Sequence, residues 1–347
     1  MRPFARRLDA RALRDNWRAA RRISGARNLL AVIKSRGYGH GARFAAEALR
    51  DTADGFGVVD MADAVMLRAC GIEKPVLLMS GAFSAAETAQ AAEMRLWTAA
   101  HHKQQVQWIA NAPSDSELTV FVKTNTGMNR LGFSPEEAAE VLDSLARAPA
   151  VAQTALMSHF ASADCPDGIR KPLEILRPLR ARAAFVSLGN SAASLLHENL
   201  EDDWGRIGIA LYGASPAPQW RSREELGLRP AMTLRTEIIC VRDIRAGETT
   251  GYGGEWRAPA DMRIGIAACG YGDGYPRAEG LWARVNGQKA RVLGRVSMEM
   301  TALDLSGCRG AENGAEVILW GESPSVDEVA AASGRVSYEL LTAAGRD

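Results

Sequence analysis

The sequence predicts an α/β fold in which an N-terminal (β/α)8 barrel of the TIM type, residues 1–225, is followed by a mostly β domain, residues 226–347. Two observations carry this prediction. Over the first part of the chain, about eight short runs of branched apolar side chains alternate with segments of helical periodicity. After about residue 225, strand-like segments joined by Gly-rich turns replace the helical segments. A doubly wound open sheet is the alternative for the first part, but it gives no reason for so regular a count.

The eight predicted barrel strands are apolar runs short enough to be buried in a parallel sheet. They comprise residues 29–34, 55–60, 75–80, 96–101, 118–124, 152–159, 184–188 and 206–212. Between them, Ala and Leu alternate with charged residues at helical spacing, most clearly at residues 42–49, 85–94, 135–146 and 169–184. This alternation of strand and helix is what the βα units of a barrel require.

The second domain is predicted from five strand-like segments, at residues 233–241, 263–269, 282–285, 289–292 and 316–320. Residues 245–249 and 285–288 have the composition of turns, and the Asn286-Gly287 pair in the second is typical of a tight β-hairpin. Only residues 326–332 and 338–344 have a helical pattern in this part of the chain.

The composition excludes several classes of protein. The formal net charge of the 347 residues is +1, so the chain lacks the basic surface that binds nucleic acid or anionic lipid. Its five cysteines are scattered without a Cys-x-x-Cys pair, which indicates neither a disulfide framework nor a metal site. No apolar run approaches the roughly 18 residues of a membrane span, and the N-terminus lacks the apolar core of a signal peptide. We therefore expect a cytoplasmic protein without a membrane partner.

The segment LLAVIKSRGYGHG, residues 29–41, joins a buried strand to a lysine. Its apolar run ends on Lys34, and a Gly-rich turn carrying Tyr38 and His40 follows. A buried ammonium is costly unless it is paired, neutralised or used in chemistry. A lysine at the mouth of a barrel strand is well placed for a Schiff base with an aldehyde cofactor. The alternative is a lysine that reaches solvent from the strand end.

Further ionisable residues follow the ends of later strands, where the active sites of such barrels collect. Lys123 and Arg130 follow the fifth strand, His159 follows the sixth, and Arg206 opens the eighth. Taken singly, His159 is more often a hydrogen-bonded structural residue, and Arg206 an ion-pair partner. Their convergence on one rim favours a functional site.

The loops after the seventh and eighth strands form a candidate phosphate site. Asn190 and Ser191 stand at a predicted helix N-terminus, and Gly208 and Ile209 lie in the segment RIGIALYG. A serine hydroxyl together with backbone N–H groups of Ser191, Gly208 and Ile209 suits a phosphate. The alternative is that Ser191 only caps the helix.

These motifs resemble those of the alanine racemases, a family of fold-type III pyridoxal-phosphate enzymes, over essentially the whole chain. The matching segments, in chain order, are AVIKSRGYGHG, KTNTGMNRLG, HFASAD, NSAAS, RIGIALYG, TGYGGEW, CGYGDGYPR and GRVSMEM. The resemblance implies an isomerase that uses pyridoxal 5′-phosphate to interconvert L-alanine and D-alanine, supplying D-alanine for peptidoglycan. It also implies a homodimer whose active site is shared between subunits.

The resemblance implies that two bases act on opposite faces of the substrate. Lys34 would form a Schiff base with the cofactor and act on the D-enantiomer, while Tyr252 would act on the L-enantiomer. In the family this tyrosine comes from the partner subunit, so the C-terminal domain would complete its neighbour's site. Both side chains have an ordinary pKa near 10, so burial and cationic neighbours would have to lower the pKa of one of them.

The resemblance also assigns the cofactor's surroundings. Arg206 would face its pyridine nitrogen, and His159 would link Arg206 to Tyr252. An arginine stays cationic and only donates hydrogen bonds, so it would leave that nitrogen unprotonated. This suits proton exchange better than transamination or decarboxylation. The residues that would hold the phosphate are Tyr38, Ser191, Gly208 and Ile209.

On the substrate side, the resemblance implies that Arg130 contacts the cofactor's phenolic oxygen and the substrate carboxylate. Lys123 matches a lysine that is carbamylated in many relatives, where the carbamate positions that arginine. Met298 would offer a backbone N–H to the carboxylate, and Tyr271 and Arg277 would line the entrance. No metal is implied.

The chain departs from the family pattern at three places. Arg36 adds a cation between Lys34 and Tyr38, Glu299 replaces an aspartate, and the chain ends at YELLTAAGRD, before a segment that family members usually carry. A racemase acting on serine or on several amino acids therefore stays an alternative. A fold-type III decarboxylase or a non-catalytic carrier of the cofactor fits less well, because neither combines the YGHG and TGYGG motifs with this second domain.

Overall fold

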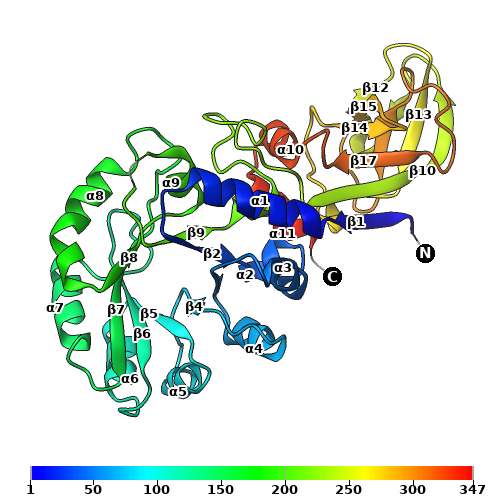
Figure 1. Ribbon diagram of the computed structural model, residues 1–347. Helices are drawn as coiled ribbons and strands as arrows, with labels where there is room; N and C mark the ends of the chain where they lie inside the picture. The colour runs from blue at the N-terminus through cyan, green and yellow to red at the C-terminus, as the bar shows by residue number, and fades with distance from the viewer. Residues whose placement is uncertain (1, 199, 346–347) are drawn as a thin grey trace.

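A computed structural model describes residues 2–198 and 200–345 of the chain, and its first large unit is a nearly closed parallel barrel (Figure 1). Its eight-stranded sheet has the order β8-β7-β6-β5-β4-β3-β2-β9. The strands are β2 (Asn28–Val32), β3 (Gly55–Val58), β4 (Val76–Leu78), β5 (Trp97–Ala100), β6 (Leu118–Lys123), β7 (Val151–Met157), β8 (Phe185–Ser187) and β9 (Trp204–Ile207). The predicted barrel is confirmed.

The first and last members of this sheet, β8 and β9, meet without forming a regular ladder. The Asp203 N–H donates to the Val186 carbonyl at 3.2 Å, and the Arg206 N–H donates to the Gly189 carbonyl at 2.9 Å. These two bonds close the ring of strands, so the sheet has no free edge there. Inside the ring, Leu30, Leu77, Ala99, Phe121, Ala155 and Met157 form a small separate core.

The eighth barrel strand differs from its predicted range of 206–212. The observed strand β9 ends at Ile207, and the 3-10 helix η2 (Ile209–Tyr212) follows. Gly208, at φ −109° and ψ −94°, ends the strand. A Cβ at this position would lie 2.4 Å from the Tyr38 hydroxyl, so the close approach of that side chain requires a glycine. Arg206 therefore lies inside the strand.

Helices follow the barrel strands as predicted. They are α3 (Ala42–Leu49), α4 (Met61–Ala69), α5 (Ala85–Glu93), α6 (Lys103–Ala110), α7 (Pro135–Leu145), α8 (Arg170–Leu176) with the 3-10 helix η1 (Arg177–Arg182), and α9 (Ser191–Leu196). Local signals explain some boundaries: α7 begins with a Ser134/Glu137 capping box and a proline at its first turn. None of the helices in the described ranges has the length and apolarity to cross a membrane.

The C-terminal unit is a seven-stranded antiparallel sheet in the order β1-β10-β13-β16-β15-β14-β17. Its strands include β10 (Met232–Ile244), β13 (Met262–Ala267), β14 (Trp282–Val285), β15 (Gln288–Leu293), β16 (Thr301–Asp304) and β17 (Glu316–Trp320), and a short hairpin pairs β11 (Thr249–Thr250) with β12 (Trp256–Arg257). Asn286 and Gly287 both have positive φ, 48° and 77°, as the predicted tight hairpin requires. The helices α10 (Val326–Ser333) and α11 (Ser337–Ala344) follow.

The C-terminal sheet contains a strand from the N-terminus of the chain, which the sequence did not reveal. β1 (Phe4–Leu8) pairs antiparallel with β10, so the N-terminus belongs to the C-terminal sheet, while α1 (Ala10–Ile23) runs back along the barrel (Figure 1). The fully buried Asn16 of α1 donates to the carbonyls of Leu211 and Arg229 at 2.9 and 2.8 Å. The domain limits 1–225 and 226–347 stay a prediction. They do not include β1 in the second domain, although this strand pairs there.

Candidate active site

A cavity of about 710 Å³ opens at the carboxyl ends of the barrel strands. It gathers ten of the side chains or loop residues that the sequence singled out. They are Lys34, Tyr38, Lys123, Arg130, His159, Asn190, Ser191, Arg206, Gly208 and Ile209. These residues come from five separate places in the chain, so the barrel topology brings them together as predicted.

An unusual turn places Lys34 and Tyr38 on the same wall. The short helical segment α2 (Lys34–Tyr38) is left-handed: Ser35, Arg36 and Tyr38 have φ of 52°, 55° and 52°. A left-handed turn costs each non-glycine residue about 1–2 kcal/mol, and such strain persists where the surroundings fix it, often at functional sites. Hydrogen bonds within the turn hold it, among them Gly37 N–H to the Ile33 carbonyl at 2.8 Å.

The Arg206 guanidinium is almost completely buried and held by the barrel itself. One terminal nitrogen donates to the carbonyl and the hydroxyl of Ser187, both at 2.7 Å. The other donates to the carbonyls of Ser158 and Leu188 at 2.6 and 3.3 Å. In the described part of the chain no acceptor is bound to its Nε–H, which leaves one donor on a cation that lines the cavity.

Positive charge dominates the cavity. Lys34, Lys123, Arg130 and Arg206 line it, whereas Glu339, which carries the one lining carboxylate among residues 2–198 and 200–345, is ion-paired with Arg335. Burial is the main cause that lowers the pKa of Lys123 to about 8, followed by the charges of Arg206, Arg130 and Lys34. Burial followed by Arg130 and Arg206 also lowers the pKa of Lys34. The cavity is therefore electrostatically suited to an anion.

His159 has no charge to add to this group at neutral pH. Burial, with Arg206, Arg130 and the two lysines following in that order, lowers the pKa of His159 to about 3. Burial lowers the pKa of Arg206 to about 10, so the guanidinium stays charged. No hydrogen bond joins His159 to Arg206 within the described residues, so the predicted link between them is not made in a single chain.

The candidate phosphate site is assembled with one difference from the prediction. The Gly208 N–H donates to the Ser191 hydroxyl at 2.9 Å, so it is already used. Asn190, not Ser191, caps α9, because its side chain accepts from the Ala193 N–H. The Tyr38 hydroxyl lies against Gly208. Two hydroxyls and the loop of Gly208 and Ile209 thus face one end of the cavity.

Four predicted residues lie elsewhere. Tyr252, Tyr271, Arg277 and Met298 belong to the C-terminal unit and do not line the cavity. Tyr252, Tyr271 and Met298 are exposed by 67%, 44% and 58%, and Arg277 is exposed as well. Tyr271 and Met298 are neighbours, since the Tyr271 N–H donates to the Ser297 carbonyl and the Gly272 N–H to the Met298 carbonyl. Together with Met300 they leave an exposed group of large apolar side chains on this face.

The sequence did not reveal the outer wall of the cavity. The helix α11 and the residue before it supply Val336, Tyr338, Glu339 and Thr342. Their helical pattern was detected, but a pattern of this kind does not show which face meets a cavity in another unit. No group of three or more His, Cys, Asp or Glu side chains within the described ranges is arranged to bind a metal ion.

Comparison with known proteins agrees with this geometry. Residues 8–216 match the family model of the alanine racemase N-terminal domain, and residues 231–347 match that of the alanine racemase C-terminal domain. The chain belongs to the alanine racemase family. It is therefore an enzyme of the isomerase class, as predicted.

Individual alanine racemases are similar over nearly their full length. The catabolic alanine racemase of Klebsiella aerogenes is 44% identical over 345 residues, which are 99% of this chain and 97% of that protein. The alanine racemase of Thiobacillus denitrificans is 45% identical over 346 residues, 99% of this chain and 94% of that protein. The crystal structure of the biosynthetic alanine racemase from Pseudomonas aeruginosa has a TM-score of 0.95 at 41% identity, covering 99% of this chain and 97% of that chain.

Proposed function

We propose that this protein interconverts L-alanine and D-alanine with pyridoxal 5′-phosphate as cofactor, and that Lys34 and Tyr252 are its two bases. The observation that carries the proposal is the lysine of lowered pKa in a cavity with three further cations and two hydroxyls. A lysine with lowered pKa is a better nucleophile toward an aldehyde. The cations suit an anionic substrate such as an amino acid with its carboxylate, and the two hydroxyls suit the phosphate of the cofactor.

The residues of the cavity fit the proposed cofactor. Lys34 would hold its aldehyde carbon, while the hydroxyls of Tyr38 and Ser191 and the loop of Gly208 and Ile209 would hold its phosphate. The spare Nε–H of Arg206 is the donor that a pyridine nitrogen needs, and it would leave that nitrogen unprotonated. When bound, the cofactor supplies the electron sink that makes the substrate Cα–H acidic.

Racemisation requires proton transfer on both faces of the substrate α-carbon. Lys34 would hold or release the proton on one face. On the other face we assign this role to Tyr252 of the partner subunit in a homodimer, because its segment TGYGGEW matches the family motif that carries the second base. Exposed large apolar side chains support this assembly: Tyr252, Tyr271, Met298 and Met300 in the C-terminal unit, and Leu131, Val336 and Tyr338 near the cavity mouth.

The remaining residues would position the reacting groups. Arg130, which is not hydrogen-bonded within the described chain, would bind the substrate carboxylate with the backbone N–H of Met298 of the partner subunit. His159 would connect Arg206 to Tyr252 of the partner subunit as a neutral imidazole. Lys123, neutral above about pH 8, would be the amine that accepts CO₂ if it is carbamylated. Tyr271 of the partner subunit would line the entrance.

The biological role has two versions. Relatives are named both as catabolic alanine racemases, as in Klebsiella aerogenes, and as a biosynthetic one, as in Pseudomonas aeruginosa. The protein could therefore supply D-alanine for peptidoglycan or return D-alanine to breakdown. Deleting the gene and measuring growth without D-alanine, and growth on D-alanine as carbon source, separates the two.

The direct test is chiral analysis of L-alanine incubated with the purified protein and pyridoxal 5′-phosphate, beside L-serine. We expect conversion to D-alanine until the enantiomers are equal, at a rate well above that for serine. Equal or faster conversion of serine would assign a different substrate preference to the same site. No conversion of any amino acid by protein that binds the cofactor would contradict the proposal.

A further inference from the structure

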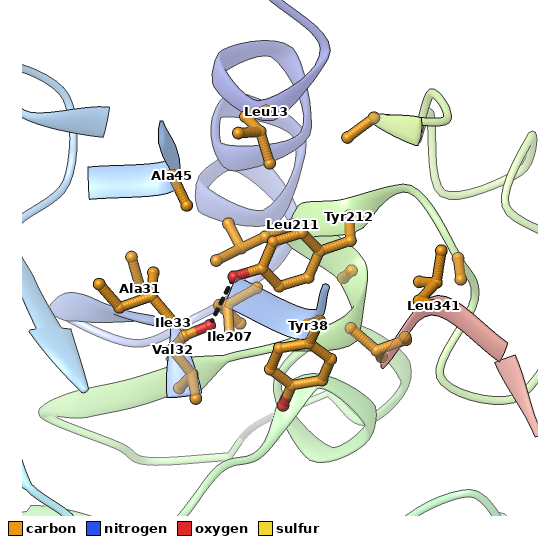
Figure 2. Packing of buried hydrophobic residues seen from close by; sticks show 14 of the residues in the cluster. Leu13, Ala31, Val32, Ile33, Tyr38, Ala45, Ile207, Leu211, Tyr212 and Leu341 are labelled. Carbon is orange, nitrogen blue, oxygen red and sulfur yellow. Dashed lines mark hydrogen bonds between the residues drawn. The ribbon is translucent and has the colours of Figure 1, made fainter. Parts of the chain in front are cut away.

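We propose that Tyr212 is a positioning residue that holds Lys34 and Tyr38, which are assigned to opposite ends of the cofactor, at a fixed separation. This inference rests on the proposed function. Tyr212 lies behind the cavity wall and does not line it, and it is only 1% exposed. Its side chain makes two separate contacts, one through the hydroxyl and one through the ring (Figure 2).

The hydroxyl of Tyr212 fixes the end of the strand that carries Lys34. It donates to the Val32 carbonyl at 3.0 Å, two residues before Lys34 (Figure 2). The pairing of β2 with β9 ends at Ala31 and Ile207, because β9 gives way to η2 at the candidate phosphate site.

The peptide that follows Val32 is held from both sides. On the β3 side, the Ile33 N–H donates to the Gly57 carbonyl at 3.0 Å. On the β9 side the strand partner has ended, and the Tyr212 hydroxyl takes its place. A buried carbonyl left without a donor is costly, so this one bond determines how the last peptide of β2 presents Lys34.

The ring of Tyr212 fixes the other end. It stacks on Tyr38, with ring centroids 4.8 Å apart and an interplanar angle of 25° (Figure 2). It also contacts His40, at 4.6 Å between centroids. The His40 Nδ1 is hydrogen-bonded to the Tyr38 carbonyl at 3.1 Å. The ring and the left-handed turn thus hold Tyr38 with its hydroxyl against Gly208.

The two contacts can be removed separately. Tyr212→Phe keeps the ring and deletes the bond to Val32, and Tyr212→Leu deletes the ring as well. The matched control is Tyr275→Phe, since Tyr275 is also 1% exposed, lies in the other unit and has a hydroxyl without a partner in the described chain. Thermal unfolding of all four proteins measures any general loss of stability.

Two measurements avoid reliance on turnover. In protein freed of cofactor, the pH dependence of Lys34 modification by an amine-reactive reagent, read by mass spectrometry, reports the pKa of Lys34. Titration with pyridoxal 5′-phosphate and with pyridoxal, which lacks the phosphate, reports the two ends of the site. In Tyr212→Phe we expect Lys34 to react only at higher pH and both ligands to bind about two- to tenfold more weakly, the range of one buried hydrogen bond.

Tyr212→Leu should in addition weaken the binding of pyridoxal 5′-phosphate more than that of pyridoxal, because only the phosphate uses Tyr38. Tyr212→Phe should weaken the binding of both ligands by the same factor. The inference is overturned if Tyr212→Phe matches the unmodified protein and Tyr275→Phe in Lys34 reactivity and in both affinities. If Tyr212→Leu does not fold, Tyr212→Phe alone decides. Unmodified protein that neither binds the cofactor nor racemises alanine would instead refute the proposed function.

Discussion

The residues proposed for the site lie in two regions that differ in exposure: those of the barrel cavity are mostly buried, and those of the C-terminal unit are exposed. Lys34, Lys123, His159 and Arg206 are buried or half-buried at the ends of strands that are packed on both sides. Tyr252 stands on the short 3-10 helix η3 (Tyr252–Gly254) between β11 and β12, 67% exposed. The barrel residues are therefore assembled around one cavity within a single chain, whereas Tyr252 lies on the surface, outside the cavity of its own chain.

The difference follows from what each half must do. Three buried or half-buried cations, Lys34, Lys123 and Arg206, line the cavity together with the exposed Arg130, and burying the three costs free energy that an anionic ligand would offset. The displayed half carries large apolar side chains instead, which gain free energy when they are covered by a partner. The proposed homodimer with a shared site would meet both requirements.

The largest expected effect tests whether the two halves meet between subunits. Lys34→Ala and Tyr252→Phe should each lower racemisation by several orders of magnitude, since each removes one proposed base. When the two inactive variants are unfolded, mixed in equal amounts and refolded, random pairing gives half heterodimers, each with one intact site. We therefore expect about a quarter of the unmodified activity to return.

The control for this mixing experiment is Lys103→Ala, which removes an exposed lysine ion-paired with Glu137 and should stay fully active alone. Mixing Lys34→Ala with itself must give nothing. If the mixed variants dimerise but recover no activity, Tyr252 does not act on the site of the partner subunit, and the proposed sharing of the site is wrong.

The second prediction concerns Lys123, which is buried among the other cations of the cavity. Burial and neighbouring cations lower the pKa of Lys123 from 10.5 to about 8. Keeping Lys123 charged in the folded state therefore lowers the free energy of unfolding by about 3 kcal/mol below about pH 8. This loss disappears above the unfolded pKa of 10.5, where the lysine is neutral in both states. Lys123→Met should raise the free energy of unfolding relative to the unmodified protein at pH 7 and lose this advantage toward pH 10.5, as denaturant titrations in CO₂-free buffer would measure.

The comparison of the two proteins isolates Lys123, because the other groups titrate in both. A difference in unfolding free energy that stays constant between pH 7 and pH 10.5 would mean that Lys123 is not held in a disfavoured charged form. The exposed Lys103→Met supplies the baseline, since its ammonium is hydrated in the folded protein.

Many of the residues that line the cavity could be predicted, because the ends of buried strands can be identified from the sequence. Lys34 and Lys123 directly follow apolar runs, His159 comes one residue after such a run, and parallel strands in a barrel end at one rim. The extent of the eighth strand was predicted wrongly because the apolar segment IALY has the composition of a strand. In the fold, Gly208 lies against the distant Tyr38 and ends the strand, and the segment forms η2 instead.

The contacts that the sequence did not reveal are those made between distant segments. The strand β1 precedes the barrel but joins β10, and Tyr338 of α11 reaches the barrel cavity from the other unit. Ser187 is another such residue: it lies in a short strand without any motif of its own. Only the fold shows that its hydroxyl accepts from Arg206.

The smallest expected effect concerns this serine and the fixed half of the site. Ser187→Ala removes one acceptor from Arg206, and the guanidinium keeps three carbonyl acceptors. A buried hydrogen bond to a charged group contributes about 1.5–3 kcal/mol, and because part of this is retained through the carbonyls, we expect kcat/KM for alanine to fall roughly three- to tenfold. Ser194→Ala is the matched control, since this buried hydroxyl has no partner in the described chain. Equal values for the two variants would show that the carbonyls alone orient Arg206.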